Sequence, residues 1–151
     1  MDKLYYSYDD MVSNCRVIVR EMAHDGYMPD VIIGPGRGAY PFGVMLSHYF
    51  EVPFEAFRWQ TRDGAIEDSE TLRHILSKYN DKTVLVVDDI NDTGATLTKV
   101  SDYMMEMMLR PGQWRSAVLV NNLPSPFEPD YHCFEINKQD EDVWVVVLCL
   151  W

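Results

Sequence analysis

Apolar and polar positions near the N-terminus follow a helical pattern. The apolar residues that recur at helical spacing are Met11, Cys15, Ile18 and Met22. A helix begins readily at a serine that can cap it, and Ser7 stands here with Asp10 three residues further on. Gly26 supplies the left-handed residue on which many helices end. The pattern therefore predicts an amphipathic helix between Ser7 and Gly26.

The rest of the chain alternates between short apolar runs and helical segments. Predicted strands cover 31–33, 53–57, 84–87, 116–120, 131–136 and 143–150, and predicted helices cover 41–50, 71–79 and the segment after 96. This alternation predicts an α/β fold, with a mostly parallel, twisted sheet flanked by helices. The polar segment 58–69 contains Gly64 and is expected to be a mobile loop. Because no linker or repeat divides the chain, residues 1–151 are expected to form a single domain.

Composition and charge limit the kind of protein this can be and the molecules that it binds. The 151 residues are 47% hydrophobic, which is enough to bury a core without disulfides. Cys15, Cys133 and Cys149 are widely spaced, form no metal-binding pattern and are expected to be reduced core thiols. A formal charge of −11 disfavours nonspecific binding to nucleic acid or to membrane surfaces. Since no apolar run approaches membrane-spanning length and no signal-peptide pattern is present, we expect a soluble cytoplasmic protein.

The residues richest in chemistry follow the predicted strand at 84–87. Asp88 and Asp89 come at its carboxyl end, which is the binding edge of a parallel sheet. Their carboxylates can accept hydrogen bonds from vicinal hydroxyls and help to hold Mg²⁺. The segment 92–96, Asp-Thr-Gly-Ala-Thr, adds hydroxyls and backbone N–H groups at a helix start, which suits a phosphate monoester. The combination predicts a site for a phosphorylated sugar, although the first residues of 92–96 would also serve as an ordinary helix cap.

A second turn between a strand and a helix supports this interpretation. Gly34, Gly36 and Gly38 permit close approach of the backbone to a ligand, and Arg37 can donate to phosphate oxygens. A glycine-rich turn alone is often only a tight connection. Together with the loop at 92–96, it becomes the second half of a divided diphosphate site.

Two motifs resemble those of a known family. Residues 84–97 resemble the motif that binds 5-phosphoribosyl-1-diphosphate (PRPP) in type I phosphoribosyltransferases, two acidic residues followed by an Asp-Thr-Gly-x-Thr loop. Residues 35–39, which include Arg37-Gly38-Ala39, resemble the pyrophosphate loop of that family. The resemblance extends from about 29 to 144 and implies the type I phosphoribosyltransferase fold with Mg²⁺ as cofactor; we also expect a homo-oligomer. The implied PRPP-binding residues are Arg37, Gly38, Asp88, Asp89, Asp92, Thr93, Gly94, Ala95 and Thr96, and the implied metal ligands are Asp88 and Asp89.

Segments in the C-terminal part resemble, in the same order along the chain, those that form the small hood over the base in 6-oxopurine phosphoribosyltransferases. The similar segments are 119–124, 129–131, 134–136 and 143–145. The resemblance implies that Trp144 stacks on the purine and that the backbone of Val145 reads the edge of the base. From the residues alone, Trp144 is also consistent with an apolar residue of a terminal strand.

Two further residues bear on the base. The resemblance implies that Asp92 handles the proton on N7, as catalytic acid or base. It also implies a lysine that reads the exocyclic O6, but this chain has Asn121 there, whose amide donates a hydrogen bond without charge. Lys138 lies too far along the chain for that role to be assigned to it.

The implied reaction is Mg²⁺-dependent transfer of the phosphoribosyl group from PRPP to a purine base such as guanine, xanthine or hypoxanthine. Diphosphate is released, and the pathway is nucleotide salvage. A noncatalytic regulator that keeps the nucleotide pocket is the alternative. A phosphoacceptor receiver domain also has aspartates at strand ends, but its acidic pair is not contiguous with a phosphate loop. The absence of lysine from 58–69 disfavours enzymes of the orotate type, which use a loop lysine.

Overall fold

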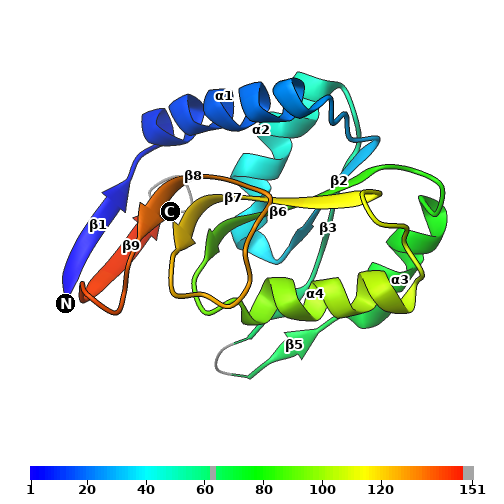
Figure 1. Cartoon of the computed structure of the whole chain (residues 1–151). Helices are drawn as coiled ribbons and strands as arrows, with labels where there is room; N and C mark the ends of the chain where they lie inside the picture. Colours follow the sequence, from blue (N-terminus) through cyan, green and yellow to red (C-terminus); the bar gives the residue numbers. More distant parts are fainter. Residues whose placement is uncertain (62–63, 148–151) are drawn as a thin grey trace.

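The computed structural model describes residues 1–61 and 64–147 and contains a central sheet of five parallel strands. In spatial order these strands are β3 (Phe54–Phe57), β2 (Val31–Pro35), β6 (Val84–Asn91), β7 (Trp114–Asn122) and β8 (Tyr131–Ile136). Because every pair in this sheet is parallel, the carboxyl ends of the strands meet at one edge. The predicted α/β fold with a mostly parallel, helix-flanked sheet is confirmed (Figure 1).

Helices cover both faces of the sheet. Helices α1 (Tyr8–Asp25) and α2 (Tyr40–Phe50) lie on one face, and α3 (Ser69–Lys78) and α4 (Ala95–Glu106) lie on the other (Figure 1). Two hydrophobic clusters fill the layers between the sheet and its helices. Each face of the sheet is thus buried, which explains why the first residues of β6 form an uninterrupted aliphatic run.

Local sequence signals account for the limits of α1. The Ser7 side chain accepts a hydrogen bond from the Asp10 backbone N–H, and the Asp10 carboxylate accepts one from the Ser7 N–H. This reciprocal capping satisfies two backbone donors that a helix start leaves without partners. At the other end Gly26 adopts a left-handed conformation, with φ of 68°. The prediction for this helix is confirmed.

A second, two-stranded sheet forms beside the main one. Strand β1 (Asp2–Tyr6) pairs in parallel with β9 (Val143–Val147), so the two ends of the described chain lie together (Figure 1). Strand β1 has no clear signal in the sequence, because its first residues are polar and its partner lies far along the chain. The predicted strand at 143–150 is present as far as 147, and its last three residues lie outside the described residues.

The segment 58–69 contains two short strands that the prediction of a loop did not include. Strands β4 (Trp59–Gln60) and β5 (Ile66–Glu67) pair in an antiparallel hairpin, and residues 62–63 lie outside the described residues. Trp59 is buried and packs edge-on against Phe57 and Tyr103. The contacts of Trp59 fix one end of the hairpin to the core. The sequence does not reveal this anchor, because the segment as a whole is polar.

Two other sequence predictions concern thiols and membranes. Among the described residues, Cys15 and Cys133 are thiols outside any disulfide, and Cys149 lies outside that range. Burial raises the pKa of the Cys133 thiol. Within 1–61 and 64–147, no helix has the length and apolar character needed to cross a bilayer.

Candidate active site

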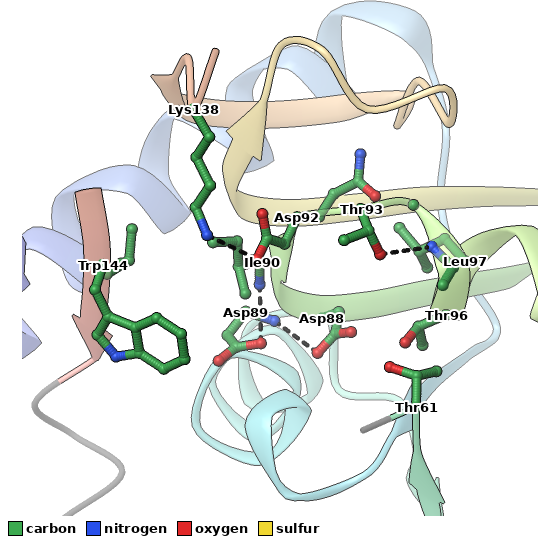
Figure 2. A pocket seen from close by; sticks show the side chains of 14 residues that line it. Thr61, Asp88, Asp89, Ile90, Asp92, Thr93, Thr96, Leu97, Lys138 and Trp144 are labelled. Carbon is green, nitrogen blue, oxygen red and sulfur yellow. Dashed lines mark hydrogen bonds and ion pairs between the residues drawn. The ribbon is translucent and has the colours of Figure 1, made fainter. Parts of the chain in front are cut away.

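A cavity with two lobes lies at the carboxyl end of β6. We call the first the hood-side lobe; its volume is about 290 Å³ and it is shown in Figure 2. It is lined by Thr61, residues 88–97, Lys138, Trp144 and Val145. The second, the glycine-loop lobe, has a volume of about 560 Å³ and is lined by residues 35–38, residues 59–61, Asp88, Asp89 and Thr96. Both lobes share Thr61, Asp88, Asp89 and Thr96, so these residues stand at their junction.

The acidic pair belongs to β6 itself, which continues four residues beyond the predicted strand end at 87. The Asp89 N–H donates to Asp88 Oδ1 at 2.9 Å, and the Ile90 N–H donates to Asp89 Oδ1 at 2.9 Å. Asp88 is only 8% exposed. Burial, and then the neighbouring Asp89 charge, raise the pKa of the Asp88 carboxyl well above its ordinary value. Full ionisation of the Asp88 carboxyl therefore requires a nearby cation or a set of hydrogen-bond donors.

This burial predicts that Asp88 destabilises the empty protein at neutral pH. The folded state holds the Asp88 proton more tightly than the unfolded chain, so stability falls as pH rises from about 3.9 through the raised pKa. We expect Asp88→Asn to raise the Tm at pH 7 by ~2 °C or more, the shift that about 1 kcal/mol produces in a domain of this size. The difference should fade towards pH 3, where the carboxyl is protonated in both states.

Calorimetry between pH 3 and pH 8 measures this effect. The exposed acid Asp102 on α4 offers a control, since Asp102→Asn removes one charge without relieving any burial. We expect the control to change stability by less than ~0.5 kcal/mol. Equal Tm profiles for Asp88→Asn and the unmodified protein would show that burial of Asp88 has no energetic cost.

The glycine-rich turn lies directly against this acidic pair. It forms the short 3₁₀ helix η1 (Arg37–Ala39) between β2 and α2. A Cβ placed on Gly38 would lie 2.8 Å from Asp89 Oδ1, and one on Gly36 would lie 2.7 Å from the Trp59 carbonyl oxygen. Only glycine allows these approaches, so the turn sits between Asp89 and the β4–β5 hairpin. Arg37 is exposed at the wall of the glycine-loop lobe.

Substitution of Gly38 by alanine should therefore disturb the Asp89 carboxylate. We expect Gly38→Ala to weaken PRPP binding about tenfold, because the new methyl group displaces either that carboxylate or the turn that carries Arg37. Isothermal titration calorimetry with PRPP and Mg²⁺ gives the affinity. Gly112→Ala is a matched control, since Gly112 has a φ of 79° but lines neither lobe; it should lower stability and leave PRPP affinity unchanged. The opposite pattern would place Gly38 outside the binding site.

The loop 92–96 forms the turn between β6 and α4. Gly94, with φ of 84°, is the N-cap residue of α4 and has no side chain with which to cap it. A Cβ on Gly94 would lie 2.7 Å from Ser125 Oγ, so glycine is required both by the backbone angle and by this close packing. The Thr93 hydroxyl accepts from the Ala95 N–H at 3.3 Å. The Thr93 hydroxyl thus serves the first backbone N–H of α4, which is the capping role that the sequence left open for the first residues of this loop.

The Asp92 carboxylate instead contacts Lys138. The Lys138 ammonium lies 2.7 Å from Asp92 Oδ2, and its Nζ is 5.7 Å from the centre of the Trp144 ring (Figure 2). The sequence analysis excluded Lys138 because of its distance along the chain. The segment between β8 and β9 returns over the end of β6, and no spacing in the sequence signals this return.

The predicted base-binding residues are not all brought together. Trp144 and Val145 line the hood-side lobe with the loop 92–96. Asn121 does not line either lobe; it is 6% exposed, and its Oδ1 accepts from Asn91 Nδ2 at 2.8 Å. These two asparagines face each other in the register of β6 and β7. Thr61 and Gln60 also line the cavity, although no motif in the sequence pointed to them.

The donor set at the strand end suits Mg²⁺ bound together with a ligand. Within the described residues, no group of three or more His, Cys, Asp or Glu side chains is placed to hold a metal ion. Asp88 and Asp89 offer carboxylate oxygens at the junction of the two lobes. Magnesium commonly uses one or two carboxylates and completes its shell with water and phosphate oxygens. The two aspartates therefore fit a magnesium ion whose remaining ligands are water or phosphate oxygens.

Comparison with known proteins defines the class. Residues 5–150 match the family described as the phosphoribosyl transferase domain, so the chain belongs to this family. It is a type I phosphoribosyltransferase domain related to the 6-oxopurine phosphoribosyltransferases. The α/β fold with its parallel sheet agrees with this class.

Individual relatives include enzymes and a regulator. The chain is 26% identical to a hypoxanthine-guanine phosphoribosyltransferase from Aquifex aeolicus, over 89% of this chain and 80% of that protein. A purine phosphoribosyltransferase structure from Pyrococcus horikoshii is 25% identical with a TM-score of 0.74, covering 97% of this chain and 93% of the other. The transcriptional regulator GfcR of Methanococcoides burtonii is 22% identical over 64% of this chain, and the match spans only 48% of the regulator.

Proposed function

We propose that this protein transfers the 5-phosphoribosyl group from PRPP to a 6-oxopurine base in nucleotide salvage, forming a nucleoside 5′-monophosphate and diphosphate. The observation that carries the proposal is the junction of the two lobes at Asp88 and Asp89. One lobe has the helix start and an aromatic wall, and the other has the glycine turn and Arg37. A ribose at this junction would direct its 5′-phosphate, base and diphosphate towards different walls.

The residues around the ribose have separate roles in this proposal. The loop 92–96 binds the 5′-phosphate at the start of α4, where backbone N–H groups and the helix dipole favour an anion. Asp88 and Asp89 accept hydrogen bonds from the ribose hydroxyls. Arg37 and the backbone at Gly38 hold the diphosphate as it leaves. Magnesium, held by Asp88 and Asp89, would supply positive charge that neutralises the diphosphate.

The base would occupy the space between Trp144 and the Asp92–Lys138 pair. Trp144 is 41% exposed and lines the hood-side lobe, so its indole is placed where it could stack on a purine. We assign recognition of O6 to Lys138 and not to Asn121, because the Lys138 ammonium reaches the hood-side lobe. The Asp92 carboxylate beside it can take the proton of N7 or return it. Val145 would read the edge of the base through its backbone.

A panel of bases tests the proposed reaction. Guanine, hypoxanthine, xanthine, adenine and orotate are each incubated with PRPP and Mg²⁺, and diphosphate and nucleotide are measured. We expect turnover with at least one 6-oxopurine and none with orotate. Turnover with a pyrimidine alone would contradict the assignment of the base, while leaving the PRPP site intact.

A noncatalytic regulator is the second candidate, and the similarity to GfcR favours it. In such a protein the same cavity would bind PRPP or a nucleotide as a signal. Base-dependent release of diphosphate distinguishes the two functions, because a regulator binds PRPP without converting it. Binding of PRPP without turnover of any base in the panel would favour the regulator.

A further inference from the structure

A single buried amide connects the phosphate loop to the lysine of the hood-side lobe. Asn122, the last residue of β7, is 7% exposed. Its Nδ2 donates to the Asp92 carbonyl oxygen at 2.9 Å, and its Oδ1 accepts from the Lys138 backbone N–H at 3.0 Å. The amide of Asn122 thereby joins two residues, Asp92 and Lys138, that lie 46 positions apart in the chain.

These contacts close a ring with the ion pair described above. The Lys138 ammonium returns to the Asp92 carboxylate at 2.7 Å, so Asp92 and Lys138 are joined through both their backbones and their side chains. Asn122 fixes the backbone connection from inside the protein. Because a buried amide loses its hydrogen bonds only at a cost, a shift of the Asp92 backbone must be accompanied by a shift of Lys138.

We propose that Asn122 is a positioning residue that couples occupancy of the phosphate loop to recognition of the base. The inference rests on the proposed function, since it assigns the 5′-phosphate to 92–96 and the base to the lobe beside Lys138. A phosphate bound by the loop fixes the Asp92 backbone. Asn122 transmits this constraint to the Lys138 backbone and so places the ammonium for the base. The two ligands consequently bind with positive cooperativity.

Ribose 5-phosphate and hypoxanthine test the coupling without turnover, because ribose 5-phosphate has no diphosphate to leave. We measure the Kd of hypoxanthine by calorimetry with and without saturating ribose 5-phosphate. We expect the unmodified protein to bind hypoxanthine at least ~5-fold more tightly when ribose 5-phosphate is present. Asn122→Asp, which keeps the shape and the acceptor but loses the donor to Asp92, should reduce this ratio below ~2.

Two further variants separate coupling from a general loss of structure. Asn137→Asp makes the same chemical change in the β8–β9 segment, where, among the residues that the structure describes, the Asn137 amide hydrogen-bonds Asp140 and Gln139 of its own turn. We expect this control to keep the unmodified ratio. In a Lys138→Met background, Asn122→Asp should have no additional effect on the ratio, because the group that it positions is gone. A purely structural role of Asn122 would lower the affinity for both ligands in either background.

Hydrogen exchange on the unmodified protein keeps the test independent of whether the variants fold. Saturating ribose 5-phosphate should slow exchange of the Lys138 backbone amide, which donates to Asn122, by at least ~5-fold. Unchanged exchange at Lys138, or an unchanged ratio in folded Asn122→Asp, would overturn the coupling while leaving the proposed transferase intact. If neither ribose 5-phosphate nor hypoxanthine binds the unmodified protein, the proposed function fails and this inference fails with it.

Discussion

Replacement of both Asp88 and Asp89 by asparagine is expected to weaken Mg²⁺-dependent PRPP binding by about 100-fold or more. The two substitutions keep the approximate shape of the strand end and remove both carboxylate charges at the junction of the lobes. A hydrogen bond to a charged group contributes about 1.5–3 kcal/mol, and a 100-fold change corresponds to about 2.7 kcal/mol. Calorimetric titration of PRPP at several Mg²⁺ concentrations measures both the affinity and its dependence on the metal.

The chain offers a control that removes the same amount of charge elsewhere. Asp81 and Asp102 are exposed and line neither lobe, so Asp81→Asn combined with Asp102→Asn should leave PRPP affinity within about twofold. Unchanged PRPP affinity in the Asp88 and Asp89 double variant would refute the assignment of this strand end to the ribose and its metal. Because Asp88→Asn alone is expected to stabilise the fold, weaker PRPP binding by the double variant would not be explained by loss of folding.

Lys138→Met is expected to lower kcat/KM for hypoxanthine by roughly 10- to 100-fold. Methionine keeps most of the apolar stem beside Trp144 and removes the ammonium that we assign to O6. The expected loss corresponds to one hydrogen bond made by a charged donor. The Kd for PRPP measured without a base should change by less than about threefold, because we assign the 5′-phosphate to backbone N–H groups of 92–96 and the diphosphate to the glycine-loop lobe, which Lys138 does not line. Steady-state kinetics gives the first quantity, and calorimetric titration of PRPP gives the second.

Lys82→Met is the control for this substitution, because Lys82 is exposed and distant from both lobes. It should leave the kinetics with hypoxanthine unchanged. If Lys138→Met also leaves them unchanged, O6 recognition belongs to another group, and Asn121 would again become a candidate. That outcome would require the side chain of Asn121 to leave Asn91, with which it is hydrogen-bonded inside the sheet.

The parts of the candidate site that the sequence predicted are those whose residues are contiguous. The acidic pair, the loop 92–96 and the start of α4 follow one another within a single strand, turn and helix. Local rules also fixed the limits of α1, since a capping serine and a terminal glycine act within their own turns. The glycine turn at 36–38 was recognised for the same reason, although its contact with Asp89 was not.

The position of Lys138 beside Asp92 could be found only in three dimensions. In sequence, Asn121 occupied the place where the family resemblance implies a lysine, and Lys138 stood apart from every motif. In the structure the first of these is buried against Asn91, and the second reaches Asp92 because the segment between β8 and β9 crosses the end of β6. Separation along a chain does not limit contact at the edge of a parallel sheet, where the ends of distant strands converge.

The sequence by itself determined the alternation of strands and helices, the loop that suits a phosphate and the acidic strand end, because each depends on residues within one or two turns of each other. Only the tertiary structure decided the pairing of β1 with β9, the hairpin anchored by Trp59 and the ring formed by Asp92, Asn122 and Lys138. These features join segments that are far apart in the chain. Their stability comes from burial and hydrogen bonding between elements, which no local pattern records.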